Sequence, residues 1–292
     1  MIELWDEFVG KVRDFFKRRG YIEVSTPILL EFPNLDPHIE PVRVEVRIGG
    51  RKRTFWLQTS PEYTMKKILS RYKKHIFQIA KCFRDNEYGK LHRVEFHMLE
   101  WYRVGADYRY LIEEIKDLTR ELMGFEDFQV MTVEEAFERF LSLPISEDEF
   151  ELRSNMEACG YEVGDEDDWE TMFHRAYLEL SEKLKAEPPT FLTDFPERLS
   201  ALAKVKGGVA ERFEFFIKGV EIANGWTEET DPEEVRRRIG KEAEKRNLPL
   251  DEEFVEAHKA MPGCAGCSIG LDRLFMIYTG AESLDDIELF RI

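Results

Sequence analysis

The residues best suited to chemistry lie between positions 83 and 103, in the segment FRDNEYGKLHRVEFHMLEWYR. Residues 75–83 form an apolar run that predicts a buried strand, a polar loop around Gly89 follows, and the next apolar-rich segment predicts a second strand. Four side chains of that second strand are two positions apart and share one face: Phe96, Met98, Glu100 and Tyr102. A carboxylate in such a row is costly unless a cation or a hydrogen-bond donor meets it.

The loop between these two strands adds groups that can bind anions. Arg84 lies where the first strand enters the loop, and His92 lies within it. A guanidinium is well suited to hold a phosphate, because it donates several hydrogen bonds from one plane. With Phe96 and Glu100, these residues suit a phosphorylated aromatic ligand plus a cation. An ordinary hairpin with a structural ion pair is the alternative interpretation.

A second pair of acidic residues, Glu214 and Glu221, depends on how the chain turns between them. On one continuous strand they would face opposite ways, because they are an odd number of residues apart. If Lys218 and Gly219 form a two-residue hairpin turn, position 216 pairs with 221 and both acids share a face. Two carboxylates on one surface suit Mg²⁺ held together with substrate phosphates. A surface strand that carries unrelated acids remains the alternative.

The elements that position these residues follow from the hydrophobic periodicity. Residues 4–19 have helical spacing and end at Gly20, a typical residue just after a helix. Residues 21–27 are expected to be extended, and residues 42–46 and 54–57 predict a hairpin. Further helices are predicted over residues 107–125, 133–140, 172–184, 232–245 and 251–260.

Three shorter signals mark the starts of predicted helices. Ser60 and Pro61 open a predicted helix that runs through Leu69, with Ser60 as its expected cap. Glu62 in its first turn either favours the helix dipole or binds a ligand. The glycine-rich run 263–270 leads into a helix over residues 270–278, a start that favours phosphate. Residues 283–286 have the spacing of a capping box for the last helix.

Composition limits the possible classes of function. The formal net charge of −17 argues against extended nucleic-acid binding, because phosphate contacts need Lys and Arg. No run approaches the roughly 20 apolar residues of a membrane span, and the acidic start is not a signal peptide. We therefore expect a cytoplasmic enzyme. Cys264 and Cys267 form a C-x-x-C, which could indicate a metal site, but small buried residues lining tight backbone are the favoured interpretation.

Three segments together resemble one family. Residues 83–103 are similar to motif 2 of class II aminoacyl-tRNA synthetases of the lysyl branch, residues 57–63 (LQTSPEY) to its TSPE motif, and residues 270–274 (GLDRL) to motif 3. The resemblance covers positions 20 to 290, with the motifs in family order. It is strongest to the short paralogues that lack the anticodon domain, the elongation factor P–(R)-β-lysine ligases. The helix, extended chain and Pro27 near the start resemble motif 1, which forms the dimer interface in class II enzymes.

The resemblance implies an α+β class II catalytic fold, an antiparallel sheet flanked by helices. It also implies one catalytic domain over residues 1–292, with a helical insertion at about residues 131–206 and no anticodon-binding domain. The implied substrate and cofactor are ATP and Mg²⁺. The catalytic residues would be Arg84 and Arg273, and Mg²⁺ would bind at Glu214 and Glu221. The residues that would bind ATP are Arg84, Asn86, His92, Phe96, Glu214, Glu221 and Arg273.

The resemblance also assigns an amino-acid pocket. Its residues would be Ser60, Glu62, Glu100, Tyr102, Asn224, Glu228 and Ser268. In the lysyl branch the position of Glu62 holds the substrate α-amino group, and those of Glu100 and Glu228 meet the distant ammonium. Two carboxylates for one cation suit a lysine-like substrate, because a buried ammonium must be fully paired.

The implied reaction activates lysine or a lysine-like diamino acid, such as (R)-β-lysine, as its adenylate. The implied acceptor is a lysine of elongation factor P rather than tRNA, and the implied assembly is a homodimer. A small-molecule amide-forming synthetase and a non-catalytic regulatory paralogue are the alternatives. The sequence departs from the family pattern at Asn86, usually glutamate, at positions 93–94, and at Ser268, glycine or alanine in the family. The last departure leaves α-lysine, β-lysine and other diamino acids open.

Overall fold

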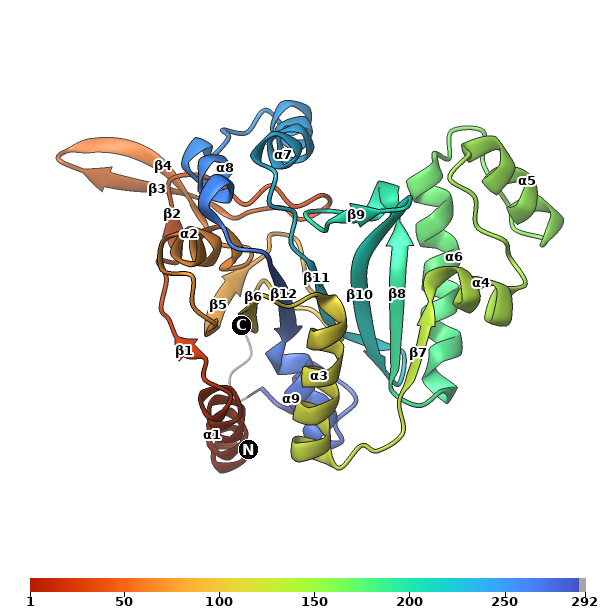
Figure 1. Cartoon of the computed structure of the whole chain (residues 1–292), viewed down its shortest axis with the longest axis horizontal. Helices are drawn as coiled ribbons and strands as arrows, with labels where there is room; N and C mark the ends of the chain where they lie inside the picture. Colours follow the sequence, from red (N-terminus) through yellow and green to blue (C-terminus); the bar gives the residue numbers. More distant parts are fainter. Residues whose placement is uncertain (289–292) are drawn as a thin grey trace.

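A computed structural model describes residues 1–288 of the chain (Figure 1). The strands are β1 (Ile22–Glu23), β2 (Leu29–Leu30), β3 (Arg43–Ile48), β4 (Arg51–Leu57), β5 (Ile76–Phe83), β6 (Glu95–Val104), β7 (Gln129–Thr132), β8 (Thr190–Pro196), β9 (Val205–Lys206), β10 (Val209–Ile217), β11 (Val220–Thr227) and β12 (Cys264–Gly270). The α-helices are α1 (Ile2–Arg18), α2 (Glu62–Tyr72), α3 (Tyr108–Met123), α4 (Val133–Leu141), α5 (Glu149–Ala158), α6 (Trp169–Lys183), α7 (Pro232–Arg246), α8 (Glu252–Ala257) and α9 (Leu271–Thr279).

One large mixed sheet organises the described residues. Its order is β1-β5-β6-β12-β11-β10-β8-β7, with β9 paired to β10. The pairs β1–β5 and β7–β8 at its two edges are parallel, and the other pairs are antiparallel. The predicted α+β class is confirmed, and the predicted antiparallel sheet describes its centre. A separate small sheet has the order β2-β4-β3, in which β3 and β4 form the predicted hairpin.

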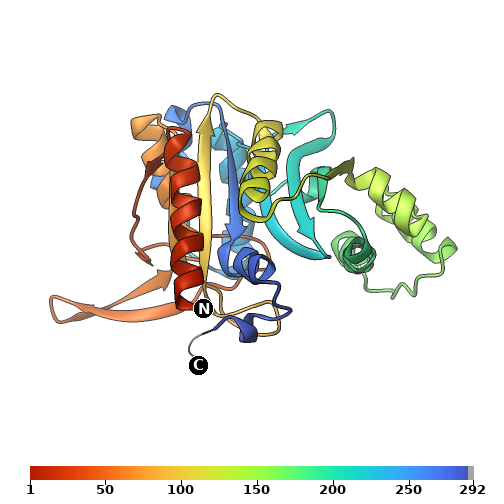
Figure 2. The same cartoon turned by 90° about the horizontal axis from the view of Figure 1, so that it is seen from below.

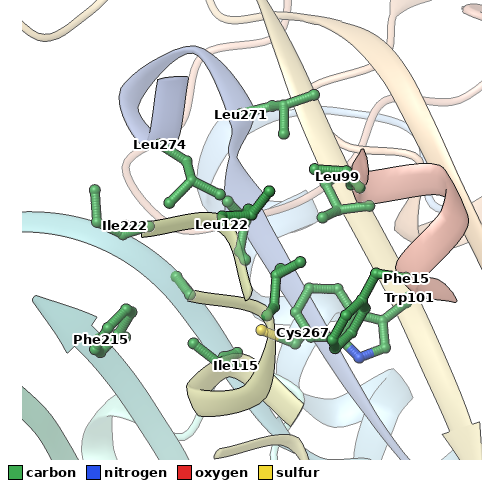
Figure 3. Close-up of a cluster of buried hydrophobic side chains, with 14 of the residues drawn as sticks. Phe15, Leu99, Trp101, Ile115, Leu122, Phe215, Ile222, Cys267, Leu271 and Leu274 are labelled. Atoms are coloured by element: carbon green, nitrogen blue, oxygen red, sulfur yellow. The ribbon is translucent and has the colours of Figure 1, made fainter. Parts of the chain in front are cut away.

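One face of the large sheet is covered by α1, α3 and α9, as the view from below shows (Figure 2). Alternate strand residues enter this core because successive side chains of a strand point to opposite faces. Leu99 and Trp101 of β6 and Cys267 of β12 lie there among the apolar stripes of the helices (Figure 3). Phe15 of α1 and Ile115 of α3 belong to the same cluster. The opposite face of these strands is therefore left for polar residues.

Strand register aligns the polar residues of that opposite face in one row across four strands. Glu100 of β6 lies opposite Ser268 of β12, which lies opposite Asn224 of β11, which lies opposite Glu214 of β10. All four residues are candidates from the sequence, drawn from segments far apart in the chain. Antiparallel pairing places such cross-strand neighbours about 5 Å apart. The row therefore links the predicted amino-acid pocket to the predicted ATP site.

The segment between motifs 2 and 3 continues this sheet and adds helices to it. Strands β7 and β8 extend the sheet beyond β10, while α4, α5 and α6 pack against them around a second apolar cluster (Figure 1). The predicted helices at 133–140 and 172–184 correspond to α4 and α6. Helix α5 is not among the helices predicted from the sequence. Its mixed polarity explains the omission, because only Leu152 and Met156 are buried in it.

The hairpin between β10 and β11 forms by the predicted turn. Lys218 and Gly219 both have positive φ, 52° and 73°, as a two-residue turn of the I′ kind requires. Phe216 lies opposite Glu221, as predicted. Lysine is uncommon at a left-handed position, so the turn could not be assigned firmly from residue preferences. With this turn Glu214 and Glu221 line the same cavity.

The rest of the hairpin differs from the prediction. A bulge follows the turn, so that Phe215 pairs with Ala223 instead of Ile222, and Glu214 faces Asn224. Strand β11 runs through Asn224 and Gly225. Gly225 serves close packing, since a Cβ there would lie 2.8 Å from the ring of Phe213 on the neighbouring strand.

Two predicted caps also need correction. Helix α2 begins at Glu62, and Ser60 lies one residue before the cap position, where its hydroxyl accepts a long 3.4 Å hydrogen bond from the Glu62 amide. The predicted capping box at 283–286 starts only a 3₁₀ turn, in which the Ser283 hydroxyl accepts from the Asp285 amide. Any helix beyond residue 288 lies outside the described residues. No helix within residues 1–288 is long and apolar enough to cross a bilayer.

Candidate active site

A cavity of about 290 Å³ lies on the polar face of the sheet. Strands β6, β11 and β12 form its floor, and the start of α2 forms one wall. All seven residues predicted for the amino-acid pocket line this cavity: Ser60, Glu62, Glu100, Tyr102, Asn224, Glu228 and Ser268. Each comes from an element whose face is set by the sheet register or by the first turn of α2. The structure thus brings together residues from four separate sequence segments.

Two of the lining carboxylates pair with a buried ammonium that the sequence analysis did not include. Lys66 of α2 is fully buried, and its Nζ lies 2.5 Å from Glu62 and 2.7 Å from Glu228. Glu100 lies in the same cavity and accepts a 2.6 Å hydrogen bond from the Tyr102 hydroxyl. Three buried carboxylates therefore share one ammonium. With all three carboxylates ionised, these four side chains would retain two formal negative charges, which two further ammonium groups would neutralise.

The electrostatics of these groups reflect their burial. Burial, followed by the neighbouring Glu62, raises the pKa of Glu100 well above its usual range. Burial raises the pKa of Glu228 to about 7, although the Lys66 ammonium opposes this rise. Burial alone would lower the pKa of Lys66, but Glu228 and Glu62 outweigh it and raise the pKa above its ordinary value. A cationic ligand would restore the charged form of both Glu100 and Glu228.

One fully buried carboxylate oxygen of the cavity has no hydrogen-bond donor among residues 1–288. This atom is Oε1 of Glu228, whereas Oε2 accepts a 2.9 Å hydrogen bond from the Trp226 indole. Leaving a buried acceptor unpaired costs about 1–3 kcal/mol, so such an atom is suited to a ligand donor. Gly266 of β12 creates the space beside it. A Cβ at this position would lie 2.5 Å from the Tyr102 ring and closer still to Glu228 Oε1.

A second cavity of about 290 Å³ lies further along the same face. It is lined by six of the seven residues predicted for ATP: Arg84, His92, Phe96, Glu214, Glu221 and Arg273. The Arg84 guanidinium lies 5.1 Å from the Phe96 ring centroid, which leaves an aromatic face and a cation side by side. Burial, followed by Arg273, lowers the pKa of His92. This neutral imidazole can donate a hydrogen bond to an anion without adding charge.

Arg273 is held where motif 3 meets the hairpin. Its Nε donates to the Leu91 carbonyl at 3.0 Å and its Nη1 donates to the Glu221 carbonyl at 3.1 Å. Arg273 lies in the first turn of α9, close to the positive end of the helix dipole. The start of α9 is fixed in turn by Asp272, which accepts from the His97 amide and contacts its ring at 2.9 Å. The result is a preorganised positive charge.

Glu214 and Glu221 fit a magnesium site that is completed by phosphates. Both line the second cavity, and burial, followed by Glu221, raises the pKa of Glu214 to about 7. Tyr177 of α6 donates to Oε2 of Glu214 and Arg212 donates to Oε1, each at 2.6 Å. Each oxygen retains a second lone pair for a metal. Within residues 1–288 no three His, Cys, Asp or Glu residues cluster as a complete metal site, so phosphate oxygens would supply further ligands.

The two cavities form one continuous site. They share Arg84, Arg212, Asn224 and Ser268 at their border. Arg212 donates from Nε to Asn224 at 3.1 Å while also pairing with Glu214, so a single guanidinium ties one cavity to the other. A phosphorylated ligand and a diamino ligand can therefore meet end to end at this border.

Comparison with known proteins agrees with this geometry. The model of the tRNA synthetases class II (D, K and N) family matches residues 1–291. The chain belongs to the class II synthetase family. A relative from Aquifex aeolicus, named elongation factor P–(R)-β-lysine ligase homolog, is 59% identical and covers 100% of this chain and 99% of its own length. The elongation factor P–(R)-β-lysine ligases of Avibacterium paragallinarum and Haemophilus influenzae are each 36% identical, covering 98% of this chain and 93% of their own.

One of the seven residues predicted to bind ATP, Asn86, lies outside the second cavity. Asn86 is exposed, has a positive φ of 62° and does not line the cavity. Its neighbour Glu87 does line it and lies 3.9 Å from Arg84. Glu87, rather than Asn86, is therefore the residue of this pair that faces the cavity.

Several residues of this synthetase site were missed by sequence reasoning. Lys66 follows Glu62 by four residues, an i,i+4 spacing that could have indicated the pair. Arg212 precedes Glu214 by two residues on β10, which places both on one face. Tyr177 has no such local signal, because α6 meets β10 only in the folded chain. Cys264 and Cys267 are buried and free, and they lie in different apolar clusters, as the small-residue interpretation expects.

Proposed function

We propose that this protein activates lysine or a lysine-like diamino acid, such as (R)-β-lysine, with ATP and transfers it to a lysine side chain of elongation factor P. The observation that carries the proposal is the cluster of three buried carboxylates, Glu62, Glu100 and Glu228, that lines the cavity and pairs with the ammonium of Lys66. Ionised, these four side chains retain two negative charges, and a diamino acid has two ammonium groups. The adjoining arginine-lined cavity suits a nucleotide, and the names of the relatives support the acceptor.

Activation joins the substrate carboxylate to the α-phosphorus of ATP and breaks the bond to pyrophosphate. The barrier is charge repulsion, so the catalyst acts by position and preorganised charge. Arg84 holds the α-phosphate at the border of the two cavities, and Arg273 holds the γ-phosphate at the start of α9. Phe96 stacks on the adenine, with His92 beside the phosphates. Glu214 and Glu221 would hold Mg²⁺ together with the phosphates, where the ion would supply positive charge against the polyphosphate.

The amino-acid cavity selects the substrate by charge. Glu62 accepts the amine near the carboxylate, while Glu100 and Glu228 take the distant ammonium, with the Tyr102 hydroxyl completing that pocket. A neutral side chain would leave buried charge unpaired and is therefore rejected. Ser60, Asn224 and Ser268 surround the reacting carboxylate, and the Ser268 hydroxyl bears on the choice between α-lysine and β-lysine.

Exchange of pyrophosphate into ATP tests the first half of the reaction without any acceptor. Purified protein is assayed with L-lysine, (R)-β-lysine, ornithine and, as neutral comparison, norleucine. We expect exchange with one or more diamino acids and none with norleucine. Folded protein that binds ATP but supports no exchange with any of them would contradict the proposal and favour a regulatory paralogue.

Substitution of Glu100 by Gln tests the carboxylate pocket. Glu100→Gln should abolish diamino-acid exchange, with a loss of at least about 100-fold, because one partner of a buried charge cluster is removed. Glu95→Gln is the matched control, since Glu95 lies on the same strand but is exposed and ion-paired with Lys81 at 2.7 Å. Near wild-type exchange in Glu100→Gln would remove this residue from the pocket.

We also propose a cytoplasmic homodimer that acts through a single catalytic domain without using tRNA. Motif 1 supports the dimer, because large apolar side chains remain exposed along it, among them Ile22, Ile28 and Leu29. The net charge of −17 opposes tRNA binding. Sedimentation velocity at micromolar concentration tests the dimer.

A further inference from the structure

A cluster of titratable side chains lies at the mouth of the amino-acid cavity, and no step of activation uses it. His38, in the loop between β2 and β3, places its Nε2 3.2 Å from Glu170 of α6. The rings of His38 and His174 are 6.0 Å apart. All three residues line the same cavity as Glu62 and Glu100. We name His38, Glu170 and His174 the mouth cluster.

Transfer has a chemical requirement that activation lacks. The acceptor lysine must attack as a neutral amine, yet with a pKa of about 10.4 only about one in 2,500 such amines is neutral at pH 7. In the attack a C–N bond forms at the activated carbonyl, the C–O bond to the phosphate breaks, and AMP leaves with that electron pair. The ammonium loses one proton before attack and the amine loses another as the amide forms. A base beside the carbonyl would accelerate this step.

We propose that His174 is the base that takes the proton from the acceptor lysine, and that Glu170 attracts the lysine ammonium to the mouth. This inference rests on the proposed transfer to a protein amine. His174 and Glu170 are four residues apart on α6, so both face the cavity from one side of the helix. The acceptor therefore reaches the border of the two cavities along α6, the helix whose Tyr177 also contacts Glu214.

His174 is better placed than His38 to accept the proton. The Nε2 of His38 is already paired with Glu170. Neither ring nitrogen of His174 makes a hydrogen bond within residues 1–288. Arg212, at the border of the two cavities, contributes to lowering the pKa of His174. His174 thus lines the cavity in which the activated carboxyl group would be held, with no hydrogen bond to occupy its ring nitrogens.

The surroundings keep His174 neutral near pH 7. The charged and titratable groups that face it are His38 from the loop, Arg212 from β10, and Asp168 and Glu170 from the start of its own helix. Burial, followed by His38, lowers the pKa of His174 below its ordinary value, and the two carboxylates only partly offset this. A lowered pKa means that the basic form persists to more acidic pH, and transfer slows only as pH falls through that value.

The experiment separates the two half-reactions. Enzyme carrying the adenylate of whichever diamino acid supports exchange is mixed with elongation factor P, and single-turnover amide formation is followed by mass spectrometry between pH 6 and 9. His174→Asn should leave pyrophosphate exchange within about twofold of wild type. It should slow transfer at pH 7 by about 100-fold, the usual contribution of a general base. The residual rate should rise by about tenfold per pH unit, as free amine becomes available.

The controls make each outcome decisive. His75→Asn is the matched control, because His75 lies outside the cavity and its Nδ1 accepts a backbone hydrogen bond that asparagine can also accept. Unchanged transfer in His174→Asn would overturn the inference, as would loss of exchange in a folded variant, which would place His174 in activation. His174→Gln replaces the first variant if that one does not fold. A wild-type enzyme that activates no diamino acid would instead contradict the proposed function.

Discussion

At the scale of single residues, buried charges distinguish the proposed active site. Glu62, Glu100 and Glu228 are buried together, and Lys66 compensates only one of their three charges. An isolated buried carboxylate would shift its pKa and become neutral, as the raised pKa of Glu100 shows. These carboxylates therefore favour a ligand with positive groups, as the proposed diamino acid has. Lys66 is a positioning residue in this scheme, since its ammonium holds Glu62 and Glu228 at a defined separation.

Gly266 is predicted to be essential for amino-acid use. Gly266→Ala would place a methyl group against Tyr102 and Glu228, so the pocket carboxylate must move. We expect the specificity constant for diamino-acid exchange to fall by about 100-fold, as a displacement of about 1 Å can cost this much. ATP binding, measured by calorimetry, should remain. Gly263→Ala is the control, because nothing lies within 4 Å of a Cβ there; equal activity of both variants would contradict the assignment.

At the scale of elements, α6 contacts the proposed ATP site. The Tyr177 hydroxyl donates to Glu214 at 2.6 Å and thereby favours the charged carboxylate. Because burial, followed by Glu221, raises the pKa of Glu214 to about 7, a substantial fraction of it is protonated at neutral pH. Protonation competes with Mg²⁺, which binds the ionised form. Helix α6 therefore affects the protonation of Glu214 on strand β10.

Tyr177→Phe should raise the Mg²⁺ concentration needed for half-maximal exchange at pH 7. We expect about a fivefold increase, since a lost hydrogen bond of this kind contributes about 1 kcal/mol. The increase should shrink at pH 8.5, where Glu214 is ionised even with a higher pKa. Tyr161→Phe is the control, because Tyr161 makes a similar 2.8 Å hydrogen bond to Glu179 on the exposed side of the same insertion. Equal Mg²⁺ dependence for both variants at pH 7 would exclude this role of Tyr177.

At the scale of the whole molecule, the net charge bears on whether tRNA or a protein is the acceptor. A charge of −17 repels a phosphate backbone, and affinity for tRNA grows with the number of basic contacts. We expect the enzyme to modify elongation factor P while leaving total tRNA uncharged under the same conditions. Acid-precipitable aminoacylation with radiolabelled amino acid measures this, with a lysyl-tRNA synthetase as positive control. Charging of tRNA at a rate comparable to modification of elongation factor P would contradict the proposed acceptor.

Much of the fold and site was predictable because it depends on local pattern. The period-two row that ends in Glu100 and Tyr102 assigns a face on β6 wherever the strand lies. The TSPE segment places Glu62 in the first turn of α2 for a similar reason. By contrast, the shared cavity of Glu214 and Glu221 required a turn with Lys218 at positive φ and a bulge after it, and residue preferences predict neither.

The sequence by itself determined the composition of the site: an arginine, an aromatic and a set of carboxylates in a known order of motifs. Only the tertiary structure decided which groups neutralise one another. Lys66 lies between two carboxylates, one of them 162 residues further along the chain, and Tyr177 and His174 reach the site from a distant insertion. Burial and pairing depend on long-range contacts, and these determine the pKa of each group and the charge left for a ligand.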